Sequence, residues 1–220
     1  MKEKRLHDDK IELIHVTKKF GQELVLKEVN LTLEQGRVYG IVGNNGSGKT
    51  VLMKCICGFL PATTGTIHVS GKQIGKDTYF PESLGVIIET PGFLTQYTGM
   101  KNLEILANMQ KLISKADIRL ILRKVGLDPD MKKPVGKYSL GMRQRLGIAQ
   151  AIMEDPRLLI LDEPFNGLDK HGVAEIRELL LELKAAGKTI LLASHNEKDI
   201  RILCDHVYEM DGGILKERTG

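Results

Sequence analysis

The chain has 220 residues, of which 42% are hydrophobic and 27% are charged, and its formal net charge is +4. This length and composition fit one large or two modest soluble domains with an apolar core. The small net charge and the absence of tryptophan give no reason to expect nucleic-acid binding, and no apolar run is long enough to span a membrane. We therefore expect a cytosolic protein whose three cysteines, Cys55, Cys57 and Cys204, are buried thiols.

The first ninety residues are predicted to be mostly strands. Apolar and polar residues alternate over 11–16 and 25–33, which is typical of antiparallel strands. Short apolar runs predict further strands at 38–42, 65–69 and 84–88. A helix is expected over 49–57, directly after the strand 38–42. This order predicts a small antiparallel β layer beside an α/β core.

Residues 43–50 (GNNGSGKT) connect that strand to that helix and match the phosphate-binding pattern G-x-x-x-x-G-K-[ST]. Glycines let the backbone turn tightly, so that successive N–H groups can surround a phosphate at the positive end of a helix. Lys49 can reach the β- and γ-phosphates, and the Thr50 hydroxyl can ligate Mg²⁺. The sequence therefore predicts a nucleoside triphosphate site formed by Gly43, Asn44, Asn45, Gly46, Ser47, Gly48, Lys49 and Thr50.

The middle of the chain has a helical pattern. One helix is predicted over 100–111, and a second begins at Ser114, which can form a capping box with Asp117. We interpret residues of about 90–137 as a helical subdomain. It is inserted into a single domain of residues 1–220, whose core comprises about 1–89 and 138–220.

The last third of the chain alternates helices with strands. Helices are expected over 139–153, 170–186 and 196–203, and strands over 158–161, 190–193, 207–210 and 214–215. Such alternation is typical of a parallel sheet covered by helices on both faces. The predicted fold class is therefore α/β, with a P-loop core, an N-terminal antiparallel β layer and the inserted helical subdomain.

Two carboxylates follow the apolar strand 158–161. A strand end beside the phosphate loop can place Asp162 in the Mg²⁺ shell, and Glu163 is then placed to accept a proton from an attacking water. On its own, this pattern would be read as a solvated strand end. The phosphate loop upstream makes the catalytic interpretation the better one.

Residues 138–145 (YSLGMRQR) resemble the LSGGQ signature of ABC-type ATPases, with Ser139 and Gly141 retained. A serine hydroxyl and a bare backbone at a helix N-terminus suit a γ-phosphate. Residues 164–169 (PFNGLD) look like the D-loop of that family, and His195 after a predicted strand looks like its switch histidine. Five motifs match in order and spacing, over nearly the whole chain.

The resemblance implies further residue roles. Phe20 lies where the family has an aromatic side chain that stacks on adenine, and Asp169 belongs to the D-loop that contacts nucleotide. Glu89 replaces the usual glutamine that contacts Mg²⁺ and the membrane partner, and a carboxylate there can still bind the metal. This departure, with residues 90–93, resembles the ATPases of bacitracin- and lantibiotic-type export systems.

ABC-type ATPases act as head-to-tail dimers, and the resemblance implies the same for this chain. One chain would supply Lys49, Thr50, Asp162, Glu163 and His195, and the other would supply Ser139 and Gly141 across the same ATP. The implied partners are transmembrane permease subunits and a second ATPase subunit, identical or paralogous, without nucleic acid. The chain would then lie on the inner face of the membrane and couple ATP hydrolysis to export, with a peptide antibiotic as a candidate substrate.

Two other interpretations stay open. A soluble ABC ATPase could drive a process other than transport, such as cluster assembly or nucleic-acid remodelling. The sequence has no inserted arm, coiled coil or strongly basic face, which favours the transporter. A single-domain P-loop kinase fits less well, because the Ser139 signature has no role in such an enzyme.

Overall fold

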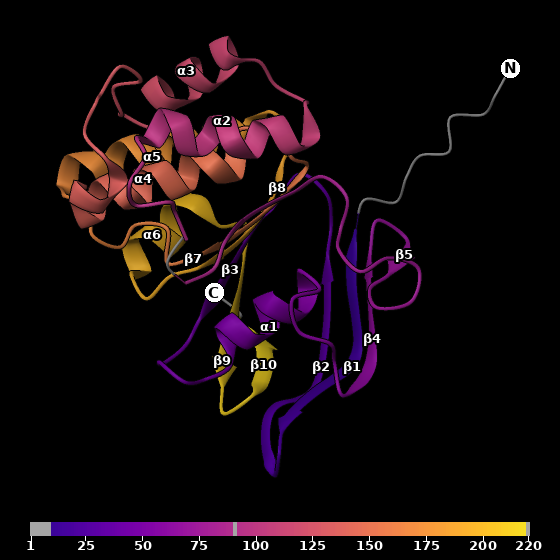
Figure 1. Cartoon of the computed structure of the whole chain (residues 1–220). Helices are drawn as coiled ribbons and strands as arrows, with labels where there is room; N and C mark the ends of the chain where they lie inside the picture. Colours follow the sequence, from indigo (N-terminus) through magenta and orange to yellow (C-terminus); the bar gives the residue numbers. More distant parts are fainter. Residues whose placement is uncertain (1–9, 90–91, 219–220) are drawn as a thin grey trace, which may run out of the picture.

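The computed structural model describes residues 10–89 and 92–218. A four-stranded antiparallel sheet is formed by the first part of the chain (Figure 1). Its strand order is β2-β1-β4-β5, and the strands are β1 (Ile11–Phe20), β2 (Glu23–Leu33), β4 (Thr64–Val69) and β5 (Lys72–Gln73). The predicted antiparallel layer is therefore confirmed.

The second sheet has six strands in the order β10-β9-β3-β8-β7-β6. Five of them run parallel: β3 (Val38–Val42), β6 (Leu84–Ile87), β7 (Leu158–Asp162), β8 (Thr189–Ala193) and β9 (His206–Asp211). The strand β10 (Ile214–Glu217) pairs antiparallel with β9 through the predicted hairpin. The parallel strands are short apolar runs because both of their faces are buried.

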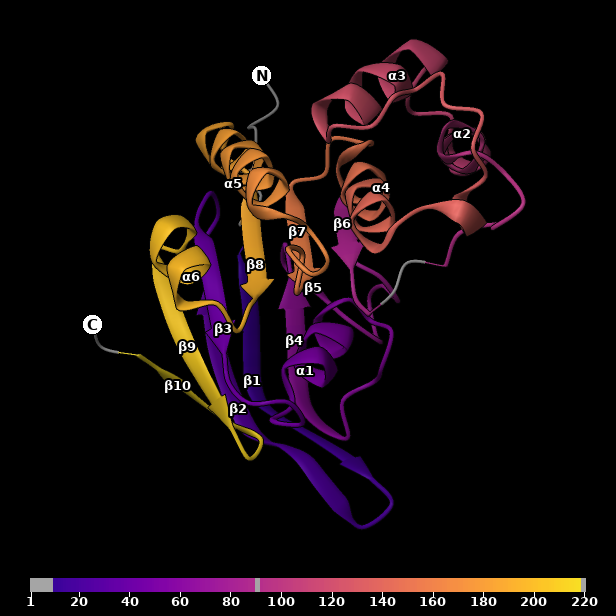
Figure 2. The same cartoon turned by 90° about the vertical axis from the view of Figure 1, so that its left-hand side faces the viewer.

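The two faces of this sheet belong to different cores. In β7, Leu158 and Ile160 pack in the core shared with the antiparallel sheet and α1 (Lys49–Ile56). Leu159 and Leu161 point to the opposite side, toward the other helices. Alternation along a strand produces this division, since successive side chains point to opposite faces. The predicted coverage of both faces is confirmed, and Figure 2 shows α1 on one side of the sheet and α4, α5 and α6 on the other.

The remaining helices have the predicted order. They are α2 (Gly99–Gln110), α3 (Lys115–Lys124), a 3-10 helix (Val135–Lys137), α4 (Leu140–Ile152), α5 (Lys170–Ala185) and α6 (Glu197–Leu203). The capping box predicted at Ser114 and Asp117 is present. The helices α2 and α3 pack outside α4 and form the helical insert, and its predicted first residue, 90, lies outside the described residues (Figure 2).

The structure extends one prediction and adds elements that the sequence did not indicate. The strand β1 continues to Phe20, although the alternation of apolar and polar residues stops at Val16. Register shifts interrupt its pairing between Leu13 and Val16, and His15 has a φ of +49°. A β-bulge breaks the period-two pattern from which strands are read, so the end of this strand was not predicted. The short β5 and the 3-10 helix were also missed.

The three cysteines are free thiols, as expected, with Cys55 and Cys57 buried and Cys204 partly buried. Burial raises the pKa of Cys55 to about 11 and that of Cys57 to about 12. Burial likewise raises the pKa of Cys204 to about 12. These thiols are therefore protonated near neutral pH, which makes them poor nucleophiles and poor metal ligands.

Candidate functional site

The glycine-rich loop lies between the end of β3 and the start of α1, as the motif requires. Gly43, Gly46 and Gly48 have φ values of +152°, +80° and +111°, which side chains other than glycine rarely tolerate. A Cβ atom on Gly43 would lie 2.2 Å from the carbonyl oxygen of Met210, so this position is also closed sterically. The loop conformation thus depends on its glycines.

Two side chains of α1 face this loop and the neighbouring strand. Lys49 is buried, with 7% of its surface exposed, and its Nζ donates to the carbonyl oxygens of Gly43 (2.6 Å) and Asn44 (3.0 Å). The Thr50 hydroxyl donates to Oδ2 of Asp162 over 2.6 Å. The phosphate loop and the carboxylate at the end of β7 are thus brought into contact, although 112 residues separate Thr50 from Asp162.

Glu163 and His195 also come together. His195 Nδ1 lies 2.9 Å from Oε2 of Glu163, and the Glu163 N–H donates to the carbonyl of Ala193 at the end of β8. Glu163 has a φ of +50°, in the left-handed region. Strained backbone of this kind is concentrated at active sites, because the surrounding structure must hold it in place.

A cavity of about 570 Å³ lies between the phosphate loop and the carboxylates of Asp162 and Glu163, and His195 is not among the described residues that line it. Its lining includes several predicted site residues, namely Asn45, Gly46, Gly48, Lys49, Thr50, Glu89, Asp162 and Glu163. A volume of this size is ordinary for a small-molecule or cofactor site. The Ser47 hydroxyl within the loop is buried and has no hydrogen-bond partner among the described residues. An orphaned hydroxyl, a glycine cradle and a lysine together fit a polyphosphate group.

The oxygen atoms of Thr50, Asp162 and Glu89 are suitable ligands for Mg²⁺, which prefers hard oxygen donors. Within 10–89 and 92–218, no group of three or more His, Cys, Asp or Glu side chains could hold a metal ion. Mg²⁺ at this site would therefore complete its shell with water and phosphate oxygens. This is the usual mode of Mg²⁺ binding at nucleotide sites.

Glu89 has a left-handed backbone, with a φ of +60°. Its Oε1 accepts a hydrogen bond from Lys54 Nζ of α1 over 2.6 Å. The Glu89 side chain is 64% exposed and also lines the cavity. The sequence indicated the position of Glu89 but not its pairing with Lys54.

The signature residues lie at the start of α4. Ser139 caps this helix, since its hydroxyl accepts from the N–H of Met142. A Cβ on Gly141 would lie 2.7 Å from the Gly167 carbonyl, so the signature and the D-loop segment are in close contact. Ser139 and Gly141 are not among the described residues that line the cavity, which Leu140, Arg143 and Gln144 reach instead.

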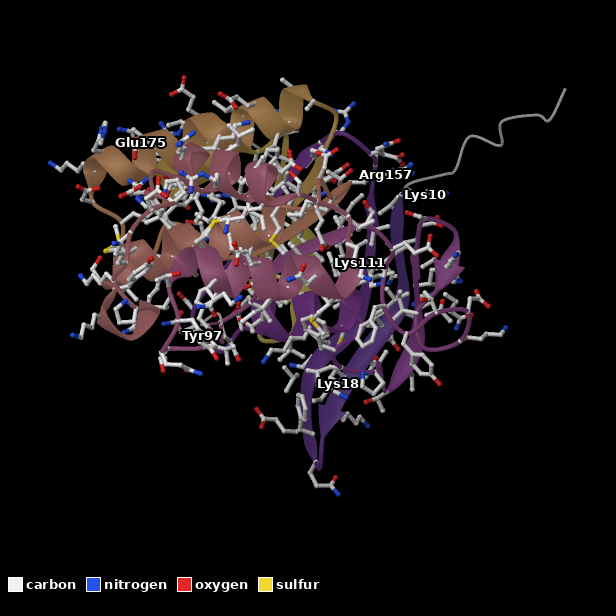
Figure 3. All side chains as sticks on the ribbon, turned by 45° about the horizontal axis from the view of Figure 1, so that its top comes forward. Lys10, Lys18, Tyr97, Lys111, Arg157 and Glu175 are labelled. Atoms are coloured by element: carbon white, nitrogen blue, oxygen red, sulfur yellow. The ribbon has the colours of Figure 1, made fainter. Side chains whose placement is uncertain are left out.

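Two other predicted residues lie away from the cavity. Phe20 ends β1 and is 45% exposed, with Lys18 Nζ 5.0 Å from the centre of its ring (Lys18 is labelled in Figure 3). Asp169 caps α5 by accepting from the Gly172 N–H over 2.8 Å. Neither residue is among the described residues that line the cavity.

Some cavity residues were not identified from the sequence. They are Val25, Val51, Leu140, Arg143, Gln144, Asn166 and Gly167. Gln144 is notable because its Nε2 donates to the carbonyl of Glu163 over 3.3 Å. Its position inside the signature segment was the available signal, but a buried glutamine on a helix does not reveal its partner.

Comparison with known proteins supports the resemblance to ABC-type ATPases. Residues 26–166 match the family described as "ABC transporter". The chain belongs to this family. It is 45% identical to an uncharacterized ABC transporter ATP-binding protein, YybJ of Bacillus subtilis, with 94% of each chain covered.

Two relatives of this ABC transporter chain have named transport roles. The bacitracin transport ATP-binding protein BcrA of Enterococcus faecalis is 43% identical over 95% of this chain and 68% of its own length. The lantibiotic transport ATP-binding protein SrtF of Streptococcus pyogenes is 35% identical over 94% of this chain and 90% of its own length. The resemblance to bacitracin- and lantibiotic-type ATPases is thus confirmed.

A solved structure shares the fold of this ABC ATPase. It is the dimeric ATP-binding cassette MJ0796 in a post-hydrolysis state bound to ADP and phosphate, with a TM-score of 0.85 and 21% identity over 96% of this chain and 99% of the other. The predicted fold class is confirmed. As an ATP-binding member of the ABC transporter family, the chain is an ATPase. No helix in the described part of the chain is long and apolar enough to cross a membrane.

Proposed function

We propose that this ATPase drives export through separate membrane subunits, and that it does so as a head-to-tail dimer. The observation that carries the proposal is the convergence of Lys49, Thr50, Asp162, Glu163 and His195 at one edge of the parallel sheet. The phosphate loop binds the β- and γ-phosphates of ATP, with Lys49 as the point charge next to them.

Hydrolysis is an in-line displacement at the γ-phosphorus. The oxygen of a water molecule bonds to phosphorus, the bond to the β–γ bridging oxygen breaks, and ADP leaves with that electron pair. Glu163 takes the proton that the attacking water loses. His195 orients the Glu163 carboxylate through the 2.9 Å contact between Nδ1 and Oε2. Thr50, Asp162 and Glu89 would hold Mg²⁺, which would supply positive charge against the phosphate oxygens.

The second half of the γ-phosphate site comes from the dimer partner. Ser139 and Gly141 are absent from the described lining of this chain's own cavity, which supports their use across the interface. The dimeric cassette with the same fold supports this arrangement. Closure on ATP then completes the catalytic set, and opening after hydrolysis releases the products. Asp169 in the D-loop would contact nucleotide at this interface, and Phe20 would stack on the adenine.

The partner that does the transport is a pair of transmembrane permease subunits. Glu89 and the helical insert formed by α2 and α3 are the proposed contact region, so ATP-dependent movement would reach the membrane there. The similarity to BcrA and SrtF supports export of a peptide antibiotic. The chain would then lie at the cytoplasmic face of the membrane, attached through its partners. These relatives favour the transporter over a soluble ABC ATPase with another task.

The direct test is Glu163→Gln. This variant should bind ATP, lose turnover, and accumulate as a dimer with ATP and Mg²⁺, because the base is removed while the phosphate contacts remain. Size-exclusion chromatography with bound nucleotide measured in each peak gives the readout. Lys49→Ala is the matched control, since it should fail to bind ATP and stay monomeric. Unchanged turnover in Glu163→Gln would refute the assignment of the base.

The transport role needs a separate experiment. Tagged chain is purified from detergent-solubilised membranes, and the ATPase activity of the eluate is measured. Recovery of a polytopic membrane protein with the chain supports the exporter. Recovery of soluble partners alone, from membranes in which other transporters remain intact, would contradict it and leave the ATP site unaffected.

A further inference from the structure

The backbone of Glu163 is fixed by contacts from its surroundings. Its φ of +50° lies in a region that residues with a side chain adopt rarely. Its N–H donates to the Ala193 carbonyl over 3.0 Å, and its carbonyl accepts from the Asn166 N–H over 3.2 Å. Such a conformation persists only where several contacts determine it.

Gln144 of α4 supplies one more contact to this backbone. Its Nε2 donates to the Glu163 carbonyl over 3.3 Å, and the Gln144 side chain is 8% exposed. Among the described residues, this carbonyl is the only hydrogen-bond partner of the Gln144 side chain. Buried amides are normally hydrogen-bonded, so this bond decides where the side chain points.

We propose that Gln144 is a positioning residue for ATP hydrolysis. It holds the Glu163 backbone in the orientation that turns the carboxylate toward the cavity and toward His195. Gln144 acts through Glu163 and not on the reacting atoms. The proposal rests on the proposed role of Glu163 as the general base.

The test is Gln144→Met, which keeps the length of the side chain and removes the donating amide. We expect kcat to fall about tenfold, a part of the roughly 10²- to 10⁴-fold that a positioned base contributes. KM for ATP and the binding of ATP should change by less than about twofold, because the phosphate loop is untouched. Gln144→Glu also lacks the donor and should act in the same direction.

The matched control is Gln150→Met on the same helix. Gln150 is partly buried, its side chain has no hydrogen-bond partner among the described residues, and it does not line the cavity. Its substitution should leave kcat unchanged. A change in thermal stability alone, with normal kcat in Gln144→Met, would mean a structural role for Gln144 and would overturn the proposal.

A double-mutant cycle with Glu163→Gln separates this inference from the base assignment. If Gln144 acts through the Glu163 carboxylate, Gln144→Met should have no further effect on the residual single-turnover rate of Glu163→Gln. An equal loss in both backgrounds would overturn the positioning role. Full turnover in Glu163→Gln would remove the base assignment itself, and the positioning role with it.

Discussion

The ion pair between Arg177 of α5 and Asp199 of α6 should be a major determinant of stability. Asp199 is almost completely buried, with 1% of its side chain exposed, and the Arg177 side chain is 15% exposed. Arg177 Nε and an Nη atom both donate to Oδ1 of Asp199, the first over 2.6 Å. The helix α6 has seven residues and begins two residues after His195, so this pair also anchors the segment that follows His195.

The expected loss of unfolding free energy follows from the burial of this ion pair. Asp199→Ala leaves a guanidinium group with little access to water and no counter-charge, which costs about 3–5 kcal/mol. Unfolding entropy near 2.1 cal/mol/K per residue gives roughly 0.46 kcal/mol/K for a chain of this size, so a loss of about 4 kcal/mol lowers Tm by about 9 °C. By contrast, the double variant Arg177→Met with Asp199→Leu removes both charges. It should lie within about 2 kcal/mol of the native protein, because replacing a buried pair by apolar groups is often nearly neutral.

Urea denaturation followed by circular dichroism gives the free energy of unfolding for the native protein, the single variants Arg177→Met and Asp199→Leu, and the double variant that combines them. The decisive quantity is the coupling energy between the two positions. Single variants that each lose less than about 1 kcal/mol would put the pair in the class of surface ion pairs. A double variant as unstable as the single ones would show that shape, and not the unpaired charge, determines the loss.

Three further variants test the ion pair between Lys54 and Glu89 at the site and the buried Cys204 thiol in the core. Lys54→Met should release the Glu89 carboxylate and so lower the Mg²⁺ concentration that gives half-maximal ATPase activity severalfold. Glu89→Gln should raise that concentration. If a Mg²⁺ titration shifts in the same direction for both variants, this reasoning is contradicted. The pKa of Cys204, raised by burial from 9.0 to about 12, exceeds that of the unfolded thiol, so the thiol's contribution is complete below pH 9 and decreases as pH rises toward 12. Cys204→Ala should reduce the decline of unfolding free energy above pH 9 by about 1.4 kcal/mol per pH unit, and an unchanged slope in urea titrations would refute it.

Much of the fold was predictable because its signals are local. Apolar runs such as 158–161 identify buried strands, and the sequence around Ser114 contains its own helix cap. The phosphate loop was predictable for the same reason, since its glycines, Lys49 and Thr50 act within one continuous segment. The end of β1 at Phe20 was not, because bulges at His15 and beyond interrupt the alternation that marks a strand.

The contacts between distant segments were the part that the sequence could not provide. Asp162 was predicted near the metal, but its hydrogen bond with Thr50 depends on which strands become neighbours. Lys54 with Glu89, and Gln144 with Glu163, pair residues on different elements. Thr50, Lys54 and Gln144 would be ordinary exposed polar side chains if their helices were rotated, so their partners require the packed structure.

The parallel sheet explains why the functional segments meet at one edge. Ile41 pairs with Ala193, and Ala193 pairs with Asp162, so β7 and β8 end in the same row and β3 ends one residue beyond it. Chain segments that continue past the carboxyl ends of parallel strands enter one crevice. Glu163 follows that row by one residue and His195 by two, which accounts for their 2.9 Å contact across two strands. A one-residue shift of β8 against β7 would reverse the direction of every side chain on β8 and carry His195 away from Glu163. The buried pairing of these strands therefore fixes the contact between Glu163 and His195 as well as the core.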